Sequence, residues 1–244
     1  MSCAWPHPIQ VTVQLPEQDH DCFGCFLGGP SAIILLVSVY PIMLKVRGRM
    51  AVVVGGGPVA MRKVRSLKKA GARITVVAED FADETDLTNV EVIRRSYQAK
   101  FLEAANLVFA CTNDQALNAR IATDARRLGA LVNCVDQPAD CDFYVPATVS
   151  RGDVIVAIGT GGAAPALAAE LKKQIDRILP DQIGEFTRAL AKIRKQLQTE
   201  VADIQQRSEI MKKLSNHASY EAFCRNGESA LAQICRESIS QDLP

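Results

Sequence analysis

Residues 49–63 constrain the fold more than any other part of this sequence. The apolar run Met50–Val54 leads into three glycines and then into a helix-like segment. Gly55, Gly57 and Ala60 occupy the three small-residue positions of the pattern G-x-G-x-x-G/A, which predicts a strand, a tight turn and a helix around a dinucleotide. In this pattern the small residues allow a sharp turn, close approach of a pyrophosphate and close helix–strand packing. The N–H groups at the start of the helix then face the phosphates.

Strand-like and helix-like segments alternate after this turn. One helix ends at Gly71, and a second covers residues 114–128 and ends before Gly129. This alternation is typical of an α/β fold with a parallel Rossmann-type sheet. The predicted strands are Met50–Val54, Arg73–Val77, 90–94, 106–111 and 131–135.

A different pattern follows the predicted sheet. A sixth strand at 153–158 leads into a glycine loop, and a helix begins near Pro165 with an apolar stripe at Leu167, Leu171 and Ile175. After Pro180 the pattern is helical to the end, as in a helical subdomain or a dimer arm. The predicted divisions are a poorly ordered extension (1–37), an NAD-binding Rossmann domain (38–147), a dimerisation and substrate segment (148–179) and a helical C-terminal subdomain (180–244).

Charge and cysteine content narrow the function classes. The net charge is +1 over 244 residues, so no global charge favours nucleic acid or a membrane surface. Eight scattered cysteines fit reduced thiols and a cytoplasmic location better than a disulfide framework. No Lys or Arg precedes Lys45, which argues against a secretory signal or a transit peptide. His20, Cys22 and Cys25 form an incomplete zinc set, so we predict no metal site.

Polar residues follow two of the predicted strands, where such sheets bind their ligands. Glu79 and Asp80 close the second strand, and an acid there normally holds the ribose hydroxyls of NAD. The alternative is that both are solvated loop acids. Thr112 and Asn113 follow the fourth strand and are candidates to contact the cofactor; capping of the next helix by Asn113 or Asp114 is an equally good interpretation.

Two further candidates lie later in the chain. Asp136 closes the fifth strand, where a carboxylate beside a nicotinamide can act as a general base or stabilise positive charge. By position alone, an Asp at a strand end is more often a turn former. Gly161 and Gly162 belong to the loop before the helix at Pro165, which suits either carboxylate binding or a tight turn.

Several motifs together resemble one family. In order and spacing they are similar to the precorrin-2 dehydrogenase family, the dehydrogenase/ferrochelatase module of siroheme synthase. The resemblance covers roughly residues 38–180, with a looser helical match beyond. The motifs that carry it lie at residues 40–44, 52–63, 71–78, 110–114, 133–143 and 158–167.

The resemblance implies NAD-dependent oxidation of precorrin-2 to sirohydrochlorin, and in some members insertion of ferrous iron. It places Pro58, Val59, Glu79 and Asp80 around NAD, and gives Asp136 the family's role in dehydrogenation. It also implies a homodimer. Some members carry a phosphorylatable serine where this chain has Ala164, so that regulation is not expected.

Precorrin-2 carries many carboxylates, so its binding needs cationic side chains or free N–H groups. We assign Arg151, with Gly161 and Gly162, to the substrate, although a solvated basic face is the better interpretation of any single cation. The alternative function is a non-catalytic Rossmann module that senses NAD. The cationic candidates are Arg126, Arg127, Arg151, Lys172 and Lys173.

Overall fold

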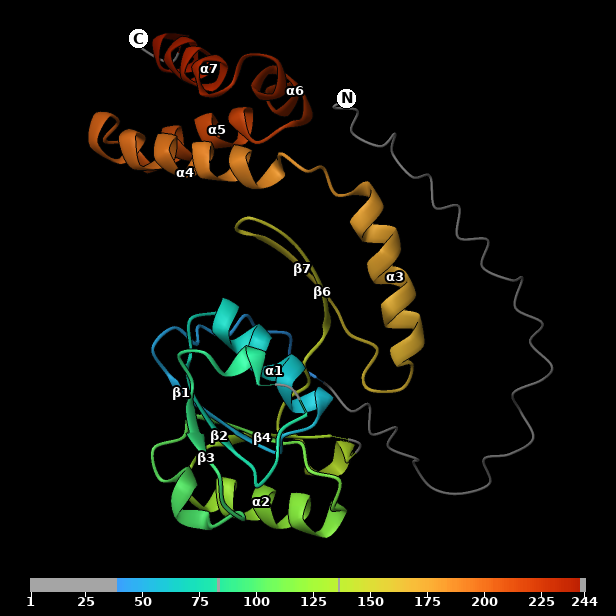
Figure 1. Cartoon of the computed structure of the whole chain (residues 1–244). Helices are drawn as coiled ribbons and strands as arrows, with labels where there is room; N and C mark the ends of the chain where they lie inside the picture. The colour runs from blue at the N-terminus through green and yellow to red at the C-terminus, as the bar shows by residue number, and fades with distance from the viewer. Residues whose placement is uncertain (1–38, 83, 136, 242–244) are drawn as a thin grey trace, which may run out of the picture. The chain divides into compact units, whose positions relative to one another are not determined.

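A computed structural model describes residues 39–82, 84–135 and 137–241. They fall into two compact units, Ser38–Val145 and Pro146–Pro244, which are described separately below (Figure 1). The predicted extension 1–37, with His20, Cys22 and Cys25, lies outside the described residues. None of the described helices is long and apolar enough to cross a membrane.

The first unit is built on five parallel strands in the order β3-β2-β1-β4-β5. The predicted parallel α/β sheet is therefore confirmed. Two strands are one residue shorter at each end than predicted (91–93 and 107–110), and a third ends one residue early (131–134). Cys111 and Val135, beyond the ends of two of these strands, still donate backbone hydrogen bonds to the neighbouring strand. The strands are β1 (Met50–Val54), β2 (Arg73–Val77), β3 (Glu91–Ile93), β4 (Leu107–Ala110) and β5 (Leu131–Cys134).

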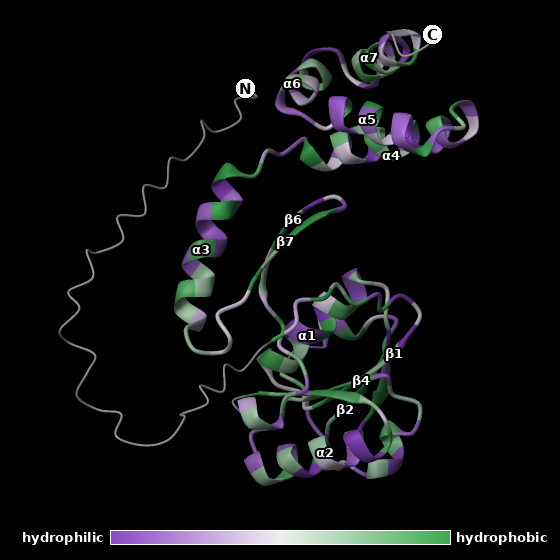
Figure 2. Ribbon diagram, turned by 180° about the vertical axis from the view of Figure 1, so that it is seen from behind, coloured by the Kyte–Doolittle hydropathy of each residue, from purple (hydrophilic) through white to green (hydrophobic). Residues whose placement is uncertain are grey.

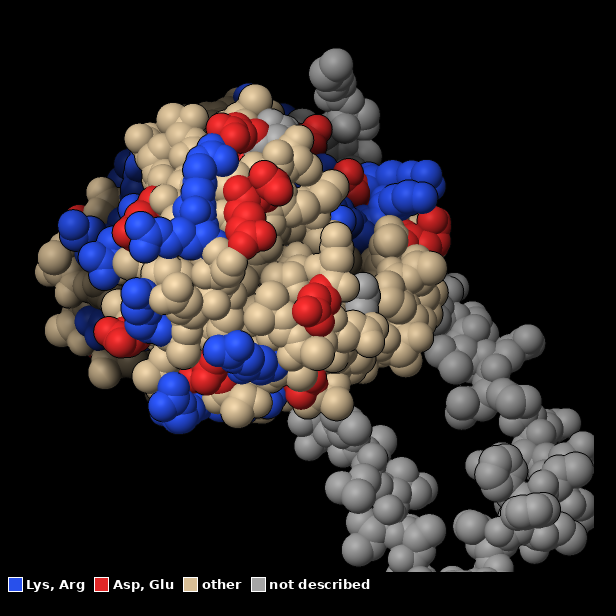
Figure 3. Space-filling view, turned by 60° about the horizontal axis from the view of Figure 1, so that its bottom comes forward, with Lys and Arg blue, Asp and Glu red and all other residues tan. Residues whose placement is uncertain are grey.

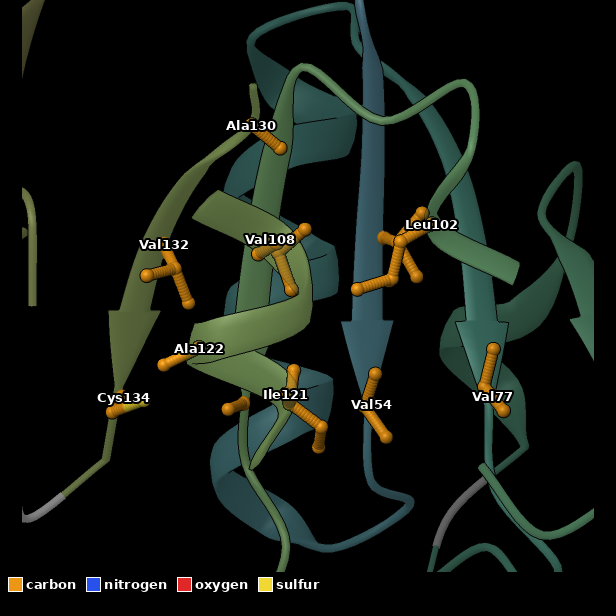
Figure 4. Close-up of a cluster of buried hydrophobic side chains, with 12 residues drawn as sticks. Val54, Val77, Leu102, Val108, Ile121, Ala122, Ala130, Val132 and Cys134 are labelled. Carbon is orange, nitrogen blue, oxygen red and sulfur yellow. The ribbon is translucent and has the colours of Figure 1, made fainter. Parts of the chain in front are cut away.

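Helices α1 (Pro58–Lys69) and α2 (Gln115–Arg127) cover opposite faces of this sheet (Figure 1). Successive strand residues point to opposite faces, so each strand contributes to both cores. Ala51 and Val53 pack with α1 in one cluster, whereas Val52 and Val54 pack with α2 in the other. Figure 4 shows this cluster on the α2 side, to which α2 contributes Ile121 and the strands contribute Val54 and Val108. Figure 2 shows the apolar strands and the mixed polarity of both helices.

Short 3-10 turns join these elements: η1 (Thr85–Leu87), η2 (Ala99–Leu102) and η3 (Pro138–Asp140). Leu102 of η2 is fully buried in the core on the α2 side. Gly71 and Gly129 follow the two helices with positive φ angles of 77°, which places the predicted helix ends correctly. On the face seen in Figure 3, basic and acidic side chains are interspersed, and neither sign forms a continuous patch.

The second unit begins with an antiparallel hairpin of β6 (Ala147–Arg151) and β7 (Val154–Ile158), followed by α3 (Pro165–Ile178). The predicted sixth strand thus exists, but it pairs with β6, to which the sequence analysis assigned no strand. The sequence of β6, Ala-Thr-Val-Ser-Arg, has one large apolar residue, Val149, which is buried. The strand therefore shows little apolar periodicity in the sequence. The tight turn at Gly152 packs on Gly184, where a Cβ would lie 2.4 Å from the carbonyl oxygen of Arg151.

Four helices complete the chain, as predicted for the region after Pro180. They are α4 (Ile183–Glu200), α5 (Ile204–Leu214), α6 (His217–Asn226) and α7 (Glu228–Gln241). Their core contains a cluster of three rings in which Phe186 meets Tyr220 edge-on at 5.3 Å and lies 5.5 Å from Phe223. Such aromatic pairs add directional packing to the burial of the apolar stripes.

Candidate functional site

Gly55 brings the ends of two strands into contact. Its φ angle is +122°, and a Cβ at this position would lie 2.4 Å from the carbonyl oxygen of Cys111. Its N–H donates to the carbonyl of Val77 at 2.8 Å. The turn after β1 therefore packs directly against β4 and β2, as the first glycine of the pattern requires.

Gly56 is equally constrained, although the sequence analysis did not single it out. A Cβ here would lie 1.9 Å from the carbonyl oxygen of Asp80, and the Gly56 carbonyl accepts a 2.9 Å hydrogen bond from the N–H of Ala82. The loop after β2 thus folds back onto the glycine turn. The motif requires glycine only at positions 55 and 57 in this stretch. The third consecutive glycine was the sequence signal that Gly56 is also constrained.

Gly57 is open, in contrast to its two neighbours. No heavy atom lies within 4 Å of a Cβ built on it, beyond the adjacent chain. It is the N-cap of α1, which has no side-chain cap and no acidic residue in its first turn, and Pro58 follows it. Ala60 is fully buried under this turn. An uncapped helix start beside an open glycine is a cradle that fits the pyrophosphate of a dinucleotide.

The acids predicted to meet the ribose lie beside this cradle. Glu79 and Asp80 are exposed in the loop that follows β2. The hydroxyl of Ser96, which follows β3, donates a hydrogen bond to Glu79 Oε1. The contact between the Asp80 carbonyl and Gly56 holds this loop against the turn. Pro58 and Val59 form the exposed first turn of α1 on the other side, with Val59 half-buried.

The loop after β4 resolves the capping question. Asp114 caps α2, since its carboxylate accepts hydrogen bonds from the N–H groups of Ala116 at 2.9 Å and Leu117 at 3.1 Å. Thr112 is fixed by buried Asn118, whose Oδ1 accepts from its hydroxyl at 2.8 Å and whose Nδ2 donates to its carbonyl at 3.0 Å. Asn113 takes no part in the cap and is exposed. The sequence analysis did not identify the role of Asn118. The only sign of it in the sequence was a polar amide side chain on the apolar stripe of α2.

At the end of β5, buried polar contacts hold the returning chain. Asn133 Nδ2 donates to the carbonyl of Phe143 at 3.0 Å. The Asp142 carboxylate accepts from the Val132 N–H at 2.9 Å and from Arg126 Nε at 2.8 Å. Asp136 lies outside the described residues. The preceding residue, Val135, donates to the carbonyl of Ala110 at 3.0 Å and lies at the carboxyl edge of the sheet.

Three thiols sit in this part of the sheet. Burial raises the pKa of Cys111 to about 11 and that of Cys134 to about 12, and it also raises the pKa of Cys141. Burial lowers the pKa of Lys63, whose ammonium lies 5.6 Å from the centre of the Phe109 ring. All three thiols are free and protonated at neutral pH, which is typical of packing rather than nucleophilic cysteines.

The substrate candidates lie in the second unit. Gly161 and Gly162 are exposed with φ angles of +61° and +83°, in front of the uncapped start of α3. Arg151 is engaged within its own unit: its guanidinium pairs with Asp176 at 3.0 Å and with Asp181 at 3.1 Å. Among the described residues, no cluster of three or more His, Cys, Asp or Glu side chains is placed to hold a metal ion.

The parallel sheet, the glycine turn and the uncapped start of α1 define a dinucleotide-binding Rossmann protein. Residues 42–147 match a family model described as "Putative NAD(P)-binding". Siroheme synthase of Methylococcus capsulatus is 38% identical over 167 residues, 67% of this chain and 35% of that protein. Siroheme synthase of Actinobacillus pleuropneumoniae is 33% identical over 202 residues, 81% of this chain and 42% of that protein.

The fold is also that of a solved structure, SirC, precorrin-2 dehydrogenase. The TM-score is 0.65 at 24% identity, over 82% of this chain and 100% of that one. The chain is therefore similar to siroheme synthases over most of its length, and it shares its fold with a precorrin-2 dehydrogenase. Its matched region spans between 35% and 42% of the length of the siroheme synthases named above.

We predict that alanine changes a different property at each of the two neighbouring glycines: cofactor affinity at Gly57 and stability at Gly56. Gly57→Ala leaves the melting temperature unchanged, because space is open there, but weakens NAD binding about tenfold, since an overpacked contact costs about 1–3 kcal/mol. Gly56→Ala lowers the stability itself by about 1–3 kcal/mol, because its Cβ would meet the Asp80 backbone. Thermal unfolding and calorimetric titration with NAD measure both. Equal melting temperatures for the two variants would contradict this assignment.

The buried thiols predict a loss of stability at alkaline pH. The folded-state pKa of Cys134 is raised from an ordinary value near 9 to about 12. The protonated thiol therefore contributes stability below about pH 9, and this contribution is lost as the pH rises toward 12. Urea unfolding of the wild type and of Cys134→Ala, which has no thiol at this position, measures the free energy of unfolding of each. The difference between the two free energies should become smaller between about pH 8 and about pH 10.5. A constant difference would show that burial does not perturb this thiol.

Proposed function

We propose that this protein uses NAD to oxidise precorrin-2 to sirohydrochlorin, a step in siroheme or other modified tetrapyrrole synthesis. The open cradle at Gly57, in a chain that matches siroheme synthases at 33–39% identity, carries the proposal. The matches extend over as much as 83% of the chain, beyond the Rossmann unit. A module that only senses NAD needs no more than the Rossmann unit, so it does not account for similarity beyond that unit.

Each part of the cradle has a task in this proposal. The N–H groups at the start of α1 bind the pyrophosphate, and the open face of Gly57 lets it approach. Glu79 accepts hydrogen bonds from the ribose, with Asp80 beside it. Thr112, fixed by Asn118, and exposed Asn113 shape the nicotinamide end. When bound, NAD supplies the hydride acceptor, and the protein supplies orientation and electrostatics.

Asp136 is the proposed catalytic residue. The chain leaves the sheet at Val135, beside the carbonyl of Ala110 at the end of β4. A carboxylate at this edge is suited to accept the proton released when hydride leaves the substrate, or to stabilise positive charge on the macrocycle. The same group would take up pyrrole protons if ferrous iron is inserted. Iron would then be a substrate, bound mainly by the nitrogens of the macrocycle.

Carboxylates of precorrin-2 are proposed to bind at the N–H groups of Gly161 and Gly162, before α3. Arg151 is the weaker candidate, since Asp176 and Asp181 already neutralise its charge. A cytoplasmic location is supported by four described cysteines that are free thiols, Cys111, Cys134, Cys141 and Cys235.

A homodimer is proposed from the surface of the second unit. Helix α3 buries only Ala168, whereas Leu167 is 53% exposed and Ile155 of β7 is 51% exposed. Large apolar side chains left exposed on two elements that pack together are the kind of surface that an interface covers. A second copy of the chain is the proposed occupant of this face.

Anaerobic turnover with precorrin-2 and NAD tests the proposed function and the role of Asp136 together. The wild type should form sirohydrochlorin, and Asp136→Ala should lower kcat at least about 100-fold, the usual worth of a general base, while its Kd for NAD stays within about twofold. Asp140→Ala, a neighbouring acid on η3, is the matched control and should retain activity. Wild-type turnover by Asp136→Ala would remove that residue from the mechanism, and an inactive, folded wild type would refute the function. Parallel reactions with ferrous ion test chelation.

The dimer proposal predicts that a charge on the apolar face separates the subunits. Leu167→Asp and Ile155→Asp should sediment as monomers, because a buried carboxylate without a partner opposes association. Ile204→Asp is the matched control, since Ile204 is 73% exposed and belongs to α5, not to β7 or α3. Analytical ultracentrifugation distinguishes the outcomes. A monomeric wild type, or variants that remain dimers, would place the interface elsewhere.

A further inference from the structure

Two side chains that follow β3 reach back to the loop that follows β2. Ser96 donates its hydroxyl hydrogen to Glu79 Oε1. The guanidinium of Arg94 lies 4.8 Å from the centre of the Phe81 ring, and its Nη2 is 2.7 Å from Glu84 Oε1. The ends of β2 and β3 are thus joined by side chains as well as by the strand ladder.

This arrangement matters because the end of β2 is where a Rossmann domain meets the adenosine ribose. An exposed glutamate has several rotamers, and most of them point its carboxylate away from a bound ribose. A carboxylate has two oxygens, each able to accept more than one hydrogen bond. When Ser96 engages Oε1, the carboxylate is held in one orientation and can still accept from the ribose hydroxyls.

The same contact bears on the choice between NAD and NADP. A carboxylate fixed at the 2′ position accepts a hydrogen bond from the hydroxyl of NAD and repels the 2′-phosphate of NADP. Arg94, a cation that could otherwise attract that phosphate, is already paired with Glu84 and stacked on Phe81. Both contacts favour the unphosphorylated cofactor.

We propose that Ser96 is a positioning residue that sets cofactor specificity by orienting Glu79 toward the 2′-hydroxyl of NAD. This inference rests on the proposed function, because it requires that the first unit binds NAD. Ser96 acts through Glu79 rather than on the reacting atoms.

Calorimetric titration of the full chain with NAD and with NADP tests the proposal. Ser96→Ala should raise the Kd for NAD about threefold to tenfold, the worth of one hydrogen bond, and should leave the Kd for NADP unchanged or lower. Ser96→Thr, which keeps the hydroxyl, should restore the wild-type preference. In a Glu79→Ala background the effect of Ser96→Ala on NAD binding should fall below about twofold, because the acceptor that Ser96 orients is gone.

The matched control is Ser66→Ala, since the Ser66 hydroxyl donates only to the carbonyl of Arg62 within α1 and is exposed. It should bind both cofactors as the wild type does, and thermal unfolding should show all variants equally folded. The proposal is overturned if Ser96→Ala binds NAD normally, if the affinities for NAD and NADP fall equally, or if the loss persists undiminished in the Glu79→Ala background. A wild type that binds neither cofactor would instead refute the proposed function itself.

Discussion

The close approach of backbone to backbone at the glycine turn is the constraint on which the rest of the first unit depends. Gly55 meets the carbonyl of Cys111 at the end of β4, and Gly56 meets the carbonyl of Asp80 beyond β2. Any Cβ at either position would overlap main-chain atoms, which cannot move as a flexible side chain can. Three strand ends are thereby brought to one point, and the start of α1 opens beside them.

Polar side chains hold the loops around that point. Buried Asn118 binds both the hydroxyl and the carbonyl of Thr112, while buried Asn133 and the more exposed Asp142 secure the chain that returns along β5. Leaving a buried group without a partner costs about 1–3 kcal/mol, so each asparagine favours a single loop conformation. The edge of the sheet at which a dinucleotide would bind is therefore preorganised by residues that need not contact it.

The two parts of the second unit bury their apolar surface to different degrees. The helices α4 to α7 enclose a complete core around Phe186, Tyr220 and Phe223. The hairpin and α3 enclose little, because a two-stranded ribbon and one helix cannot bury both faces of every element. The exposed Leu167 and Ile155 follow from this geometry, and they give the proposed second copy a surface to cover.

The sequence by itself determined what depends on neighbours along the chain. The glycine turn, the helix ends at Gly71 and Gly129, and the alternation of strands and helices all arise from local backbone preferences and short-range periodicity. The resemblance to precorrin-2 dehydrogenases also came from such motifs in order. Only the tertiary structure decided that the sixth predicted strand pairs with β6, that Asp114 and not Asn113 caps α2, and that Arg151 is already paired with Asp176 and Asp181. Gly56 and Asn118 were overlooked for the same reason. The partner of each lies in another element or loop, and contacts of that kind exist only once the chain has folded.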